Sequence, residues 1–214
     1  MEEHKIDVVG RPNISITKLA PNNPVGFVIR STLYPEVVPP KNWKALGEKV
    51  PLEPYTGELP KADPEPTEED KQKAREMLAH NIRRGKLVDA LVAATEVEVP
   101  NIFVESEIDK IMAQVREDIA RMGLKFEDYI KHSGKTEDAI RGEFKEQAHK
   151  RAKLQLALNK IAEQEKVEAE HTAVDHEMGH ALQHFPDANK ALLRIHIETV
   201  LKNEKVLKML EGGK

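Results

Sequence analysis

The chain has 214 residues, and its 33 basic and 37 acidic side chains give a formal net charge of −4, so no overall positive charge would attract nucleic acid. Aromatic residues make up only 4%, which argues against a compact β-rich enzyme domain, and the absence of cysteine excludes disulfides and thiolate metal sites. No apolar run approaches the ~20 residues needed to cross a bilayer, and the N-terminus lacks the pattern of a signal peptide. We therefore expect a cytoplasmic protein of one or two domains, with no membrane or nucleic-acid partner.

The first forty residues are prone to form β-strands. Residues 14–17 alternate with period two, and residues 27–34 are rich in β-branched and aromatic side chains. The sequence Pro-Asn-Asn-Pro at positions 21–24 is a turn signal, so residues 1–40 are expected to hold a small antiparallel β-hairpin. Because two strands alone are marginally stable in water, this hairpin needs to pack on the rest of the chain or on a partner.

Residues 41–66 are expected to form a proline-rich linker. Eight of the chain's 13 prolines lie between residues 35 and 66, and proline fixes φ and favours extended geometry in the residue before it. Trp43 and Tyr55 lie in the linker, and we expect them to pin it onto the helical body. A peptide-binding role for these two aromatic side chains is the alternative.

From residue 67 to residue 214, apolar residues recur at spacings of three and four, which predicts amphipathic helices. Cap and stop residues divide this region, with an N-cap at Thr67, helix ends at Gly123 and Gly134, and the start of another long helix at Thr136. Two further helices are expected over residues 172–184 and 186–210. The predicted fold class is mainly α, with an elongated helical body, antiparallel helical arms and the small N-terminal β-hairpin.

The order of elements between Leu87 and Lys166 is the most informative pattern in the chain. A helix end runs into Val97-Glu98-Val99-Pro100, a long amphipathic helix follows, and a short helix then precedes the one that begins at Thr136. This order resembles the C-terminal chaperone body of the bacterial trigger factor family. Residues 6–50 and 67–96 also resemble the end of that family's ribosome-binding domain and the helix that follows its prolyl isomerase domain.

The resemblance implies an ATP-independent holdase, which binds unfolded or nascent polypeptides through shallow helix surfaces and needs no cofactor or catalytic residue. The family's ribosome-docking sequence, G-F-R-x-G-x-x-P, has no match here, so ribosome binding is not expected. Only the proline-rich linker stands where an FKBP-like isomerase domain would fall, so isomerase activity is not expected either. The sequence leaves a homodimer open.

Six adaptable or aromatic side chains in the helical region are candidate client contacts. They are Met112, Met122, Phe126, Tyr129, Met178 and Phe185. The alternative for each of them is a place in the core of a helical hairpin.

One motif favours a different class of function. Residues 176–180 read His-Glu-Met-Gly-His, the H-E-x-x-H pattern in which two histidines bind zinc and the glutamate is the general base. A zinc hydrolase would use His176, Glu177 and His180, with Glu198 as the third ligand. The alternative is a chance match in a histidine-rich surface helix. A helical adaptor for one dedicated partner is a third possibility.

Two basic clusters, at residues 83–86 and 149–153, are interleaved with acidic residues along predicted helices. We expect both to be solvated helix faces rather than nucleic-acid contacts.

Overall fold

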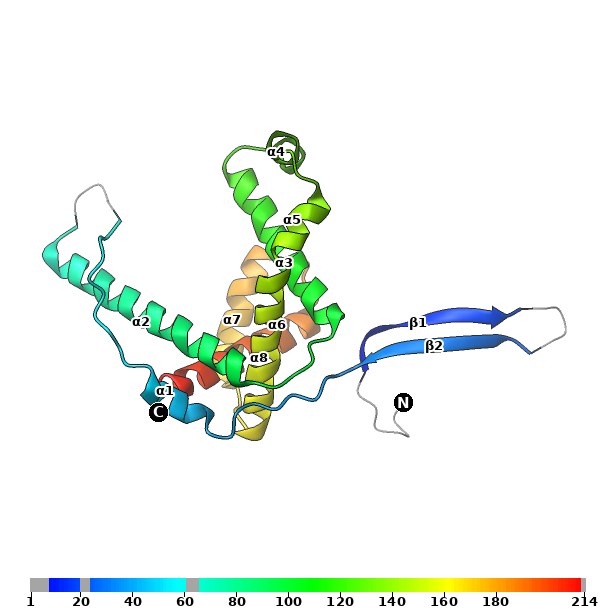
Figure 1. Ribbon diagram of the computed structural model, residues 1–214, viewed down its shortest axis with the longest axis horizontal. Coiled ribbons are helices and arrows are strands. Elements are labelled where there is room, and N and C mark those ends of the chain that lie inside the picture. Colours follow the sequence, from blue (N-terminus) through cyan, green and yellow to red (C-terminus); the bar gives the residue numbers. More distant parts are fainter. Residues whose placement is uncertain (1–7, 20–23, 61–65, 213–214) are drawn as a thin grey trace. The chain divides into compact units, whose positions relative to one another are not determined.

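The computed structural model describes residues 8–19, 24–60 and 66–212 (Figure 1). It is mainly helical, with two strands near the N-terminus, which confirms the predicted fold class. No helix in these ranges is long and apolar enough to cross a membrane. The chain divides into two compact units. Unit 1 comprises residues 1–36 and 97–152, and unit 2 comprises residues 37–96 and 153–214.

The domain boundaries expected at residues 40 and 66 stay predictions, and contacts alone define the two units. Residues 37–96 form part of unit 2, and their two ends meet, because Val38 and Glu96 exchange backbone hydrogen bonds of 2.9 and 3.0 Å. The helical region from residue 67 to 214 is therefore shared between the units. Composition alone did not reveal this division, because it depends on pairing between residues far apart in the chain.

Strands β1 (Val8–Lys18) and β2 (Gly26–Leu33) form the predicted antiparallel hairpin, with Ile14 opposite Ile29. The turn predicted at residues 21–24 lies largely outside the described residues. Gly10 has a φ of 75°, and a Cβ there would overlap Cδ1 of Ile102, so the backbone of β1 passes close to the start of α3. The ring of Tyr34, just after β2, meets Phe103 edge to face at 6.0 Å.

Unit 1 also contains α3 (Asn101–Arg121), α4 (Phe126–Ser133), α5 (Glu137–Glu143) and the first turns of α6 (Lys145–Gln164). Gly123 and Gly134 adopt φ values of 76° and 65° after α3 and α4, as their predicted stop roles require. The side chain of Thr136 accepts a hydrogen bond from the backbone of Ala139 and so caps α5.

The single long helix expected after Thr136 is wrong, because the chain breaks at Phe144 between α5 and α6. Gly142 weakens the helix just before the break, and the side chain of Phe144 packs against the core of unit 1. That core is built on the apolar stripe of α3 and completed from α4, α5 and α6. Its buried members are Val104, Ile108, Ile111, Met112, Ile119, Phe126, Ile140 and Ala148.

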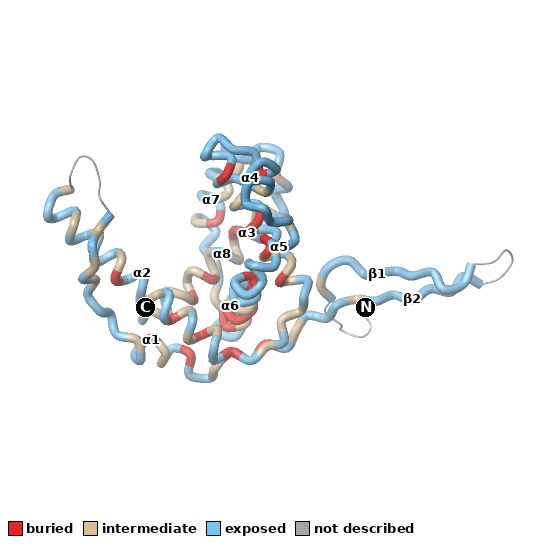
Figure 2. The backbone as a smooth tube through the Cα atoms, turned by 45° about the horizontal axis from the view of Figure 1, so that its top comes forward, coloured by how far each residue is buried: buried red, intermediate tan, exposed pale blue. Residues whose placement is uncertain are grey.

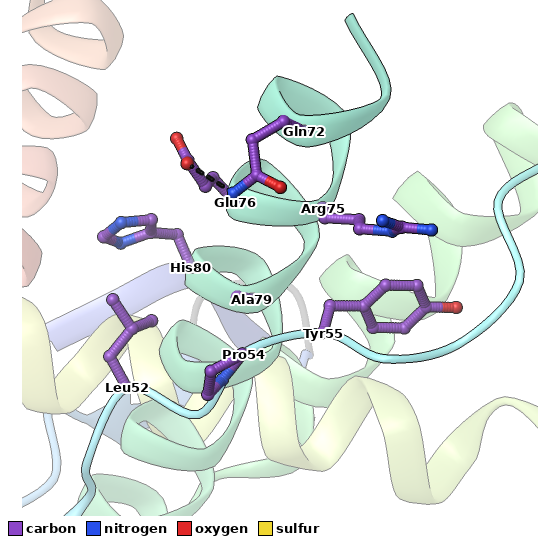
Figure 3. A pocket seen from close by; sticks show the side chains of 8 residues that line it. All are labelled: Leu52, Pro54, Tyr55, Gln72, Arg75, Glu76, Ala79 and His80. Carbon is purple, nitrogen blue, oxygen red and sulfur yellow. Dashed lines mark hydrogen bonds between the residues drawn. The ribbon is translucent and has the colours of Figure 1, made fainter. Parts of the chain in front are cut away.

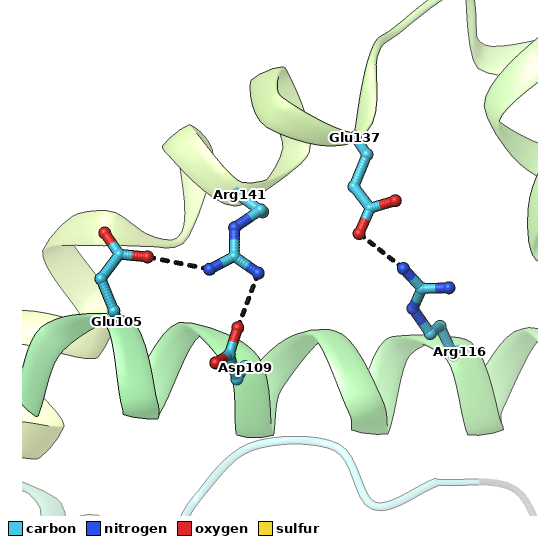
Figure 4. Close-up of polar contacts among 5 residues, drawn as sticks. All are labelled: Glu105, Asp109, Arg116, Glu137 and Arg141. Carbon is cyan, nitrogen blue, oxygen red and sulfur yellow. Dashed lines mark hydrogen bonds and ion pairs between the residues drawn. The ribbon is translucent and has the colours of Figure 1, made fainter. Parts of the chain in front are cut away.

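Ion pairs tie α5 to α3 on the surface of unit 1 (Figure 4). Arg141 donates to Asp109 at 2.7 Å and to Glu105 at 2.8 Å, and Arg116 pairs with Glu137. The hydrogen bonds to Asp109 and Glu105 raise the pKa of Arg141 above its ordinary value. These contacts join α5 to α3 at the surface, beside the apolar core that the two helices share.

Unit 2 contains a 3-10 helix (Trp43–Ala45), α1 (Leu46–Lys49), α2 (Glu68–Ala94), the rest of α6, α7 (His171–His184) and α8 (Lys190–Leu210). Thr67 caps α2 in a reciprocal capping box with Asp70, as its sequence predicts. Trp43 lies in the core, so this residue does pin the linker onto the helices. The buried core residues are Trp43, Leu87, Leu91, Leu158, Ile161, Ala162, Val206 and Leu210.

Arg83 of α2 holds the ends of two other helices. Its guanidinium donates to the carbonyl oxygens of Gly47 at 2.8 Å, Val50 at 2.8 Å and Glu211 at 3.0 Å. These carbonyls lie at the C-terminal ends of α1 and α8, where the helix dipole favours a cation. A Cβ on Gly47 would overlap the carbonyl oxygen of Leu210, so the two ends approach closely. The expectation that Arg83 lies on a solvated face is therefore wrong.

Replacing Arg83 with methionine keeps the aliphatic stem but removes the donors to these three carbonyls. Because partly buried acceptors that lose their donors cost free energy, we expect the unfolding free energy of unit 2 to fall by roughly 2 kcal/mol. Urea unfolding followed by fluorescence of Trp43, the chain's one tryptophan, measures the change. Arg75→Met on the same helix is the control and should change it by less than about 0.5 kcal/mol. Equal urea midpoints for the two variants would contradict the prediction.

Candidate functional site

The six predicted client contacts fall into different environments. Met112 and Phe126 are core residues of unit 1, so their side chains are not available at the surface. Met178 is half-buried on α7. Met122, Tyr129 and Phe185 are exposed. Helical periodicity could not separate these cases, because it shows which face is apolar but not which face is covered.

A first apolar surface lies where α3 turns into α4. We call Met122, Leu124 and Tyr129, all exposed, the α3–α4 surface. The ring of Phe126 supports it from the core side, stacked on Tyr129 at a centroid distance of 6.5 Å and covered by the Arg116 guanidinium at 4.1 Å. Leu124 was missed in the sequence, because it follows Gly123 in the turn and belongs to no helical stripe.

A second apolar surface lies on the packed pair α7 and α8. We call Phe185, Leu192, Ile195 and Val200 the α7–α8 surface, and all four are exposed. Further along α8, Val206 and Leu210 are buried in the core of unit 2. Leu192 lies five full helical turns before Leu210 and so on the same side of α8, which means that this side is exposed near the start of the helix and covered near its end.

The linker and α2 enclose a shallow pocket of about 380 Å³ (Figure 3). Leu52, Pro54 and Tyr55 line it from the linker, and residues of α2 between Gln72 and His80 line it from the other side. The Tyr55 hydroxyl donates to the carbonyl of Glu58 at 3.1 Å, which holds the ring in place. The pocket is large enough for one apolar side chain of a bound peptide.

The basic cluster of α2 is tied into unit 2. Arg84 pairs with Glu204, and this hydrogen bond raises the pKa of Arg84 above its ordinary value. Lys86 pairs with Glu53 at 2.7 Å. In the second cluster, Lys150 lies 4.0 Å from Glu146 one turn away. Arg84, Lys86 and Lys150 therefore have carboxylate partners within the protein.

The H-E-x-x-H motif lies in α7, where the rings of His176 and His180 have centroids 4.7 Å apart. Glu177 lies 3.4 Å from Nδ1 of His176. Glu198, the expected third ligand, pairs with Arg194 on its own helix at 3.4 Å. Across residues 8–19, 24–60 and 66–212, no three potential ligands gather around one point. The described residues therefore do not assemble the predicted zinc hydrolase site.

Replacing Glu177 with glutamine should leave the urea midpoint unchanged, since its side chain lies exposed on a helix surface. We expect purified protein to hold well under one equivalent of zinc by mass spectrometry, and chelation to leave the fold intact, unlike a structural zinc site. Near-stoichiometric zinc together with peptidase activity that is lost in Glu177→Gln would restore the hydrolase hypothesis, because the general base would be gone.

Residues 65–211 match the family described as the C-terminus of the bacterial trigger factor protein (TF). Trigger factor of Alkaliphilus metalliredigens is 35% identical over 95 residues, which cover 44% of this chain and 22% of that protein. The trigger factors of Staphylococcus carnosus and Shouchella clausii are 32% and 33% identical over 124 and 129 residues, covering 55% and 59% of this chain. The matched parts span 28% and 29% of those two proteins.

The chain superposes on a solved structure of a trigger factor chaperone with a TM-score of 0.37 at 17% identity. That structure is described for promiscuous substrate recognition in folding and assembly activities. This match covers 67% of this chain and 38% of that chain. The family match rests on the sequence of α2 to α8 and extends over well more than half of the protein. The chain therefore belongs to the trigger factor family.

Proposed function

We propose that this chain is an ATP-independent molecular chaperone that holds unfolded or nascent polypeptides in the cytoplasm. The observation on which the proposal rests is the set of exposed apolar side chains on the α3–α4 and α7–α8 surfaces. Apolar side chains that are exposed near one another are candidates for binding the apolar segments of another chain. Membership of the trigger factor family supports the proposal, and residues 67–214 would form the chaperone domain.

Neither surface is a deep pocket, so each makes only a few contacts with a client. The α3–α4 surface belongs to unit 1 and the α7–α8 surface to unit 2, so one chain presents two separate weak sites. When a flexible client binds one site, binding of its next apolar segment becomes intramolecular. Retention then comes from the sum of weak contacts, while each contact is released quickly. Methionine suits this role because its unbranched side chain adapts to different partners.

Charged residues flank both surfaces. Arg116 pairs with Glu137 beside the α3–α4 surface, and Arg194 pairs with Asp175 at 3.1 Å between α8 and α7. Such exposed pairs contribute little to stability, but they keep the surroundings of each apolar patch hydrated. On these two surfaces, clients are therefore held by their apolar segments. We assign no catalytic residue and no cofactor to this function.

Purified protein should suppress the aggregation of several unrelated denatured proteins without ATP. The double variant Met122→Gln/Leu124→Gln removes the α3–α4 surface. We expect it to weaken client binding by roughly a hundredfold, because a client can then bind at only one of the two linked surfaces. Phe185→Ser/Leu192→Gln should have a similar effect through the other surface. Light scattering of denatured clients, over molar ratios from substoichiometric to excess, measures these changes.

Lys131→Gln on α4 is the control, because it changes an exposed polar residue near the α3–α4 surface without removing apolar area. It should suppress aggregation as the parent chain does. Circular dichroism and Trp43 fluorescence establish that each variant is folded. If the parent chain leaves the scattering of every client unchanged, the chaperone proposal is wrong.

A further inference from the structure

The β1–β2 hairpin has one apolar face that the described chain leaves uncovered. Ile14 lies opposite Ile29 and Ile16 opposite Phe27, so these four side chains point to the same side of the sheet. We call them the apolar face of the hairpin. Each of them has between 47% and 63% of its surface exposed. Figure 2 shows the same exposure along most of both strands.

The other side of the hairpin carries polar residues and Arg30, together with Val28. Asn13 lies opposite Arg30, and Ser15 lies opposite Val28. The sequence from residue 8 to residue 34 contains Arg11, Lys18 and Arg30 but no aspartate or glutamate. The hairpin therefore lacks internal ion pairs, and its field favours a partner that brings carboxylates.

The two outer edges of this sheet differ. On β1, the register shifts between Val9 and Asn13 and again between Ile16 and Lys18, and Pro12 lacks a backbone donor. Bulges and proline are the devices that block addition of a further strand. Strand β2 runs for eight residues from Gly26 to Leu33 without proline. Within the described residues the sheet has two strands only, so the outer edge of β2 has no strand beside it.

A third strand would extend this sheet at the free edge of β2. It would satisfy the outward backbone groups of β2 and place alternate side chains beside Phe27 and Ile29, and the remaining ones beside Arg30. Two hairpins from separate copies would not meet these needs, because the approach would bring like charges together. The complementary occupant is a segment with apolar side chains on one face and carboxylates on the other.

We propose that the outer edge of β2 binds an extended polypeptide segment in which apolar and acidic residues alternate. The inference rests on the proposed function, because this segment would be part of a client chain. It goes beyond that function in giving the hairpin a sequence preference that the helical surfaces lack. Binding by strand addition combines main-chain hydrogen bonds with side-chain selection on both faces.

Fluorescence anisotropy with the full chain and labelled peptides of about nine residues, the length of an ordinary strand, tests the proposal. A peptide that alternates valine and glutamate should bind at least about tenfold more tightly than its scrambled form or a valine–lysine version. Ile29→Thr should remove most of this binding. Ile82→Thr makes the same change on α2 at a site with 46% exposure, against 47% for Ile29, and should leave binding unchanged.

Two further experiments distinguish specific binding by strand addition from a loss of binding that is caused by unfolding of the hairpin. Arg30→Glu should reverse the preference, so that the valine–lysine peptide becomes the tighter ligand by about tenfold, which an unfolded hairpin cannot produce. N-methylation of the peptide at alternate residues removes donors from one of its edges. Only one of the two N-methylated forms should lose binding, because only one edge faces β2.

Equal binding of alternating and scrambled peptides would overturn the inference. So would a dimer in sedimentation that Ile29→Thr converts to a monomer, since a second copy would then cover the apolar face. Aggregation suppression is measured on the same proteins. If suppression persists while no peptide binds, the hairpin inference fails and the chaperone proposal stands. If suppression is absent, the chaperone proposal fails whatever the peptides do.

Discussion

The three hydrogen bonds from Arg83 to backbone carbonyls determine how unit 2 is built. A proline-rich linker has few backbone donors, and the helices it joins end in carbonyls that lack partners inside the helix. One planar guanidinium, with several donors in a fixed geometry, satisfies Gly47, Val50 and Glu211 together. It thereby attaches α1, the start of the linker and the end of α8 to α2. Trp43 and Leu210, which lie in the chain beside the segments that Arg83 holds, are buried in the core of the same unit.

Local sequence signals predicted much of the fold, because the features that they indicate depend only on neighbouring residues. The cap at Thr67, the left-handed glycines at positions 123 and 134 and the start of α5 at Thr136 depend on residues within one helical turn. The division into two units, the role of Arg83 and the break at Phe144 depend on contacts with distant segments. Spacing within one helix carries no information about such contacts, so residues 41–66 were predicted as a separate linker, whereas contacts group them with unit 2.

The candidate binding surfaces were only partly predictable for the same reason. Met112 and Met122 look alike in the sequence, since both belong to the apolar pattern of α3, but one faces the core and the other the solvent. Leu192 and Ile195 were overlooked because a core stripe was already assigned to α8. Leu192 and Ile195 lie on the same side of α8 as the buried residues Leu210 and Val206, so the spacing of apolar residues does not separate them. Packing against other elements decides which part of the stripe is covered.

The distribution of apolar surface also bears on mechanism. An enzyme concentrates its chemistry in one pocket, where a few groups are held close together, whereas the apolar residues exposed here lie on separate elements of both units. Separate weak sites cannot orient a reacting bond, but they can hold a flexible chain at several points and release it without an energy source. The hairpin differs from the helical surfaces, because a strand edge binds the backbone itself and requires an extended segment. The helical surfaces would accept apolar side chains from a segment in any backbone conformation. The strand edge would accept only an extended segment. The two kinds of site would therefore bind different parts of the same unfolded chain.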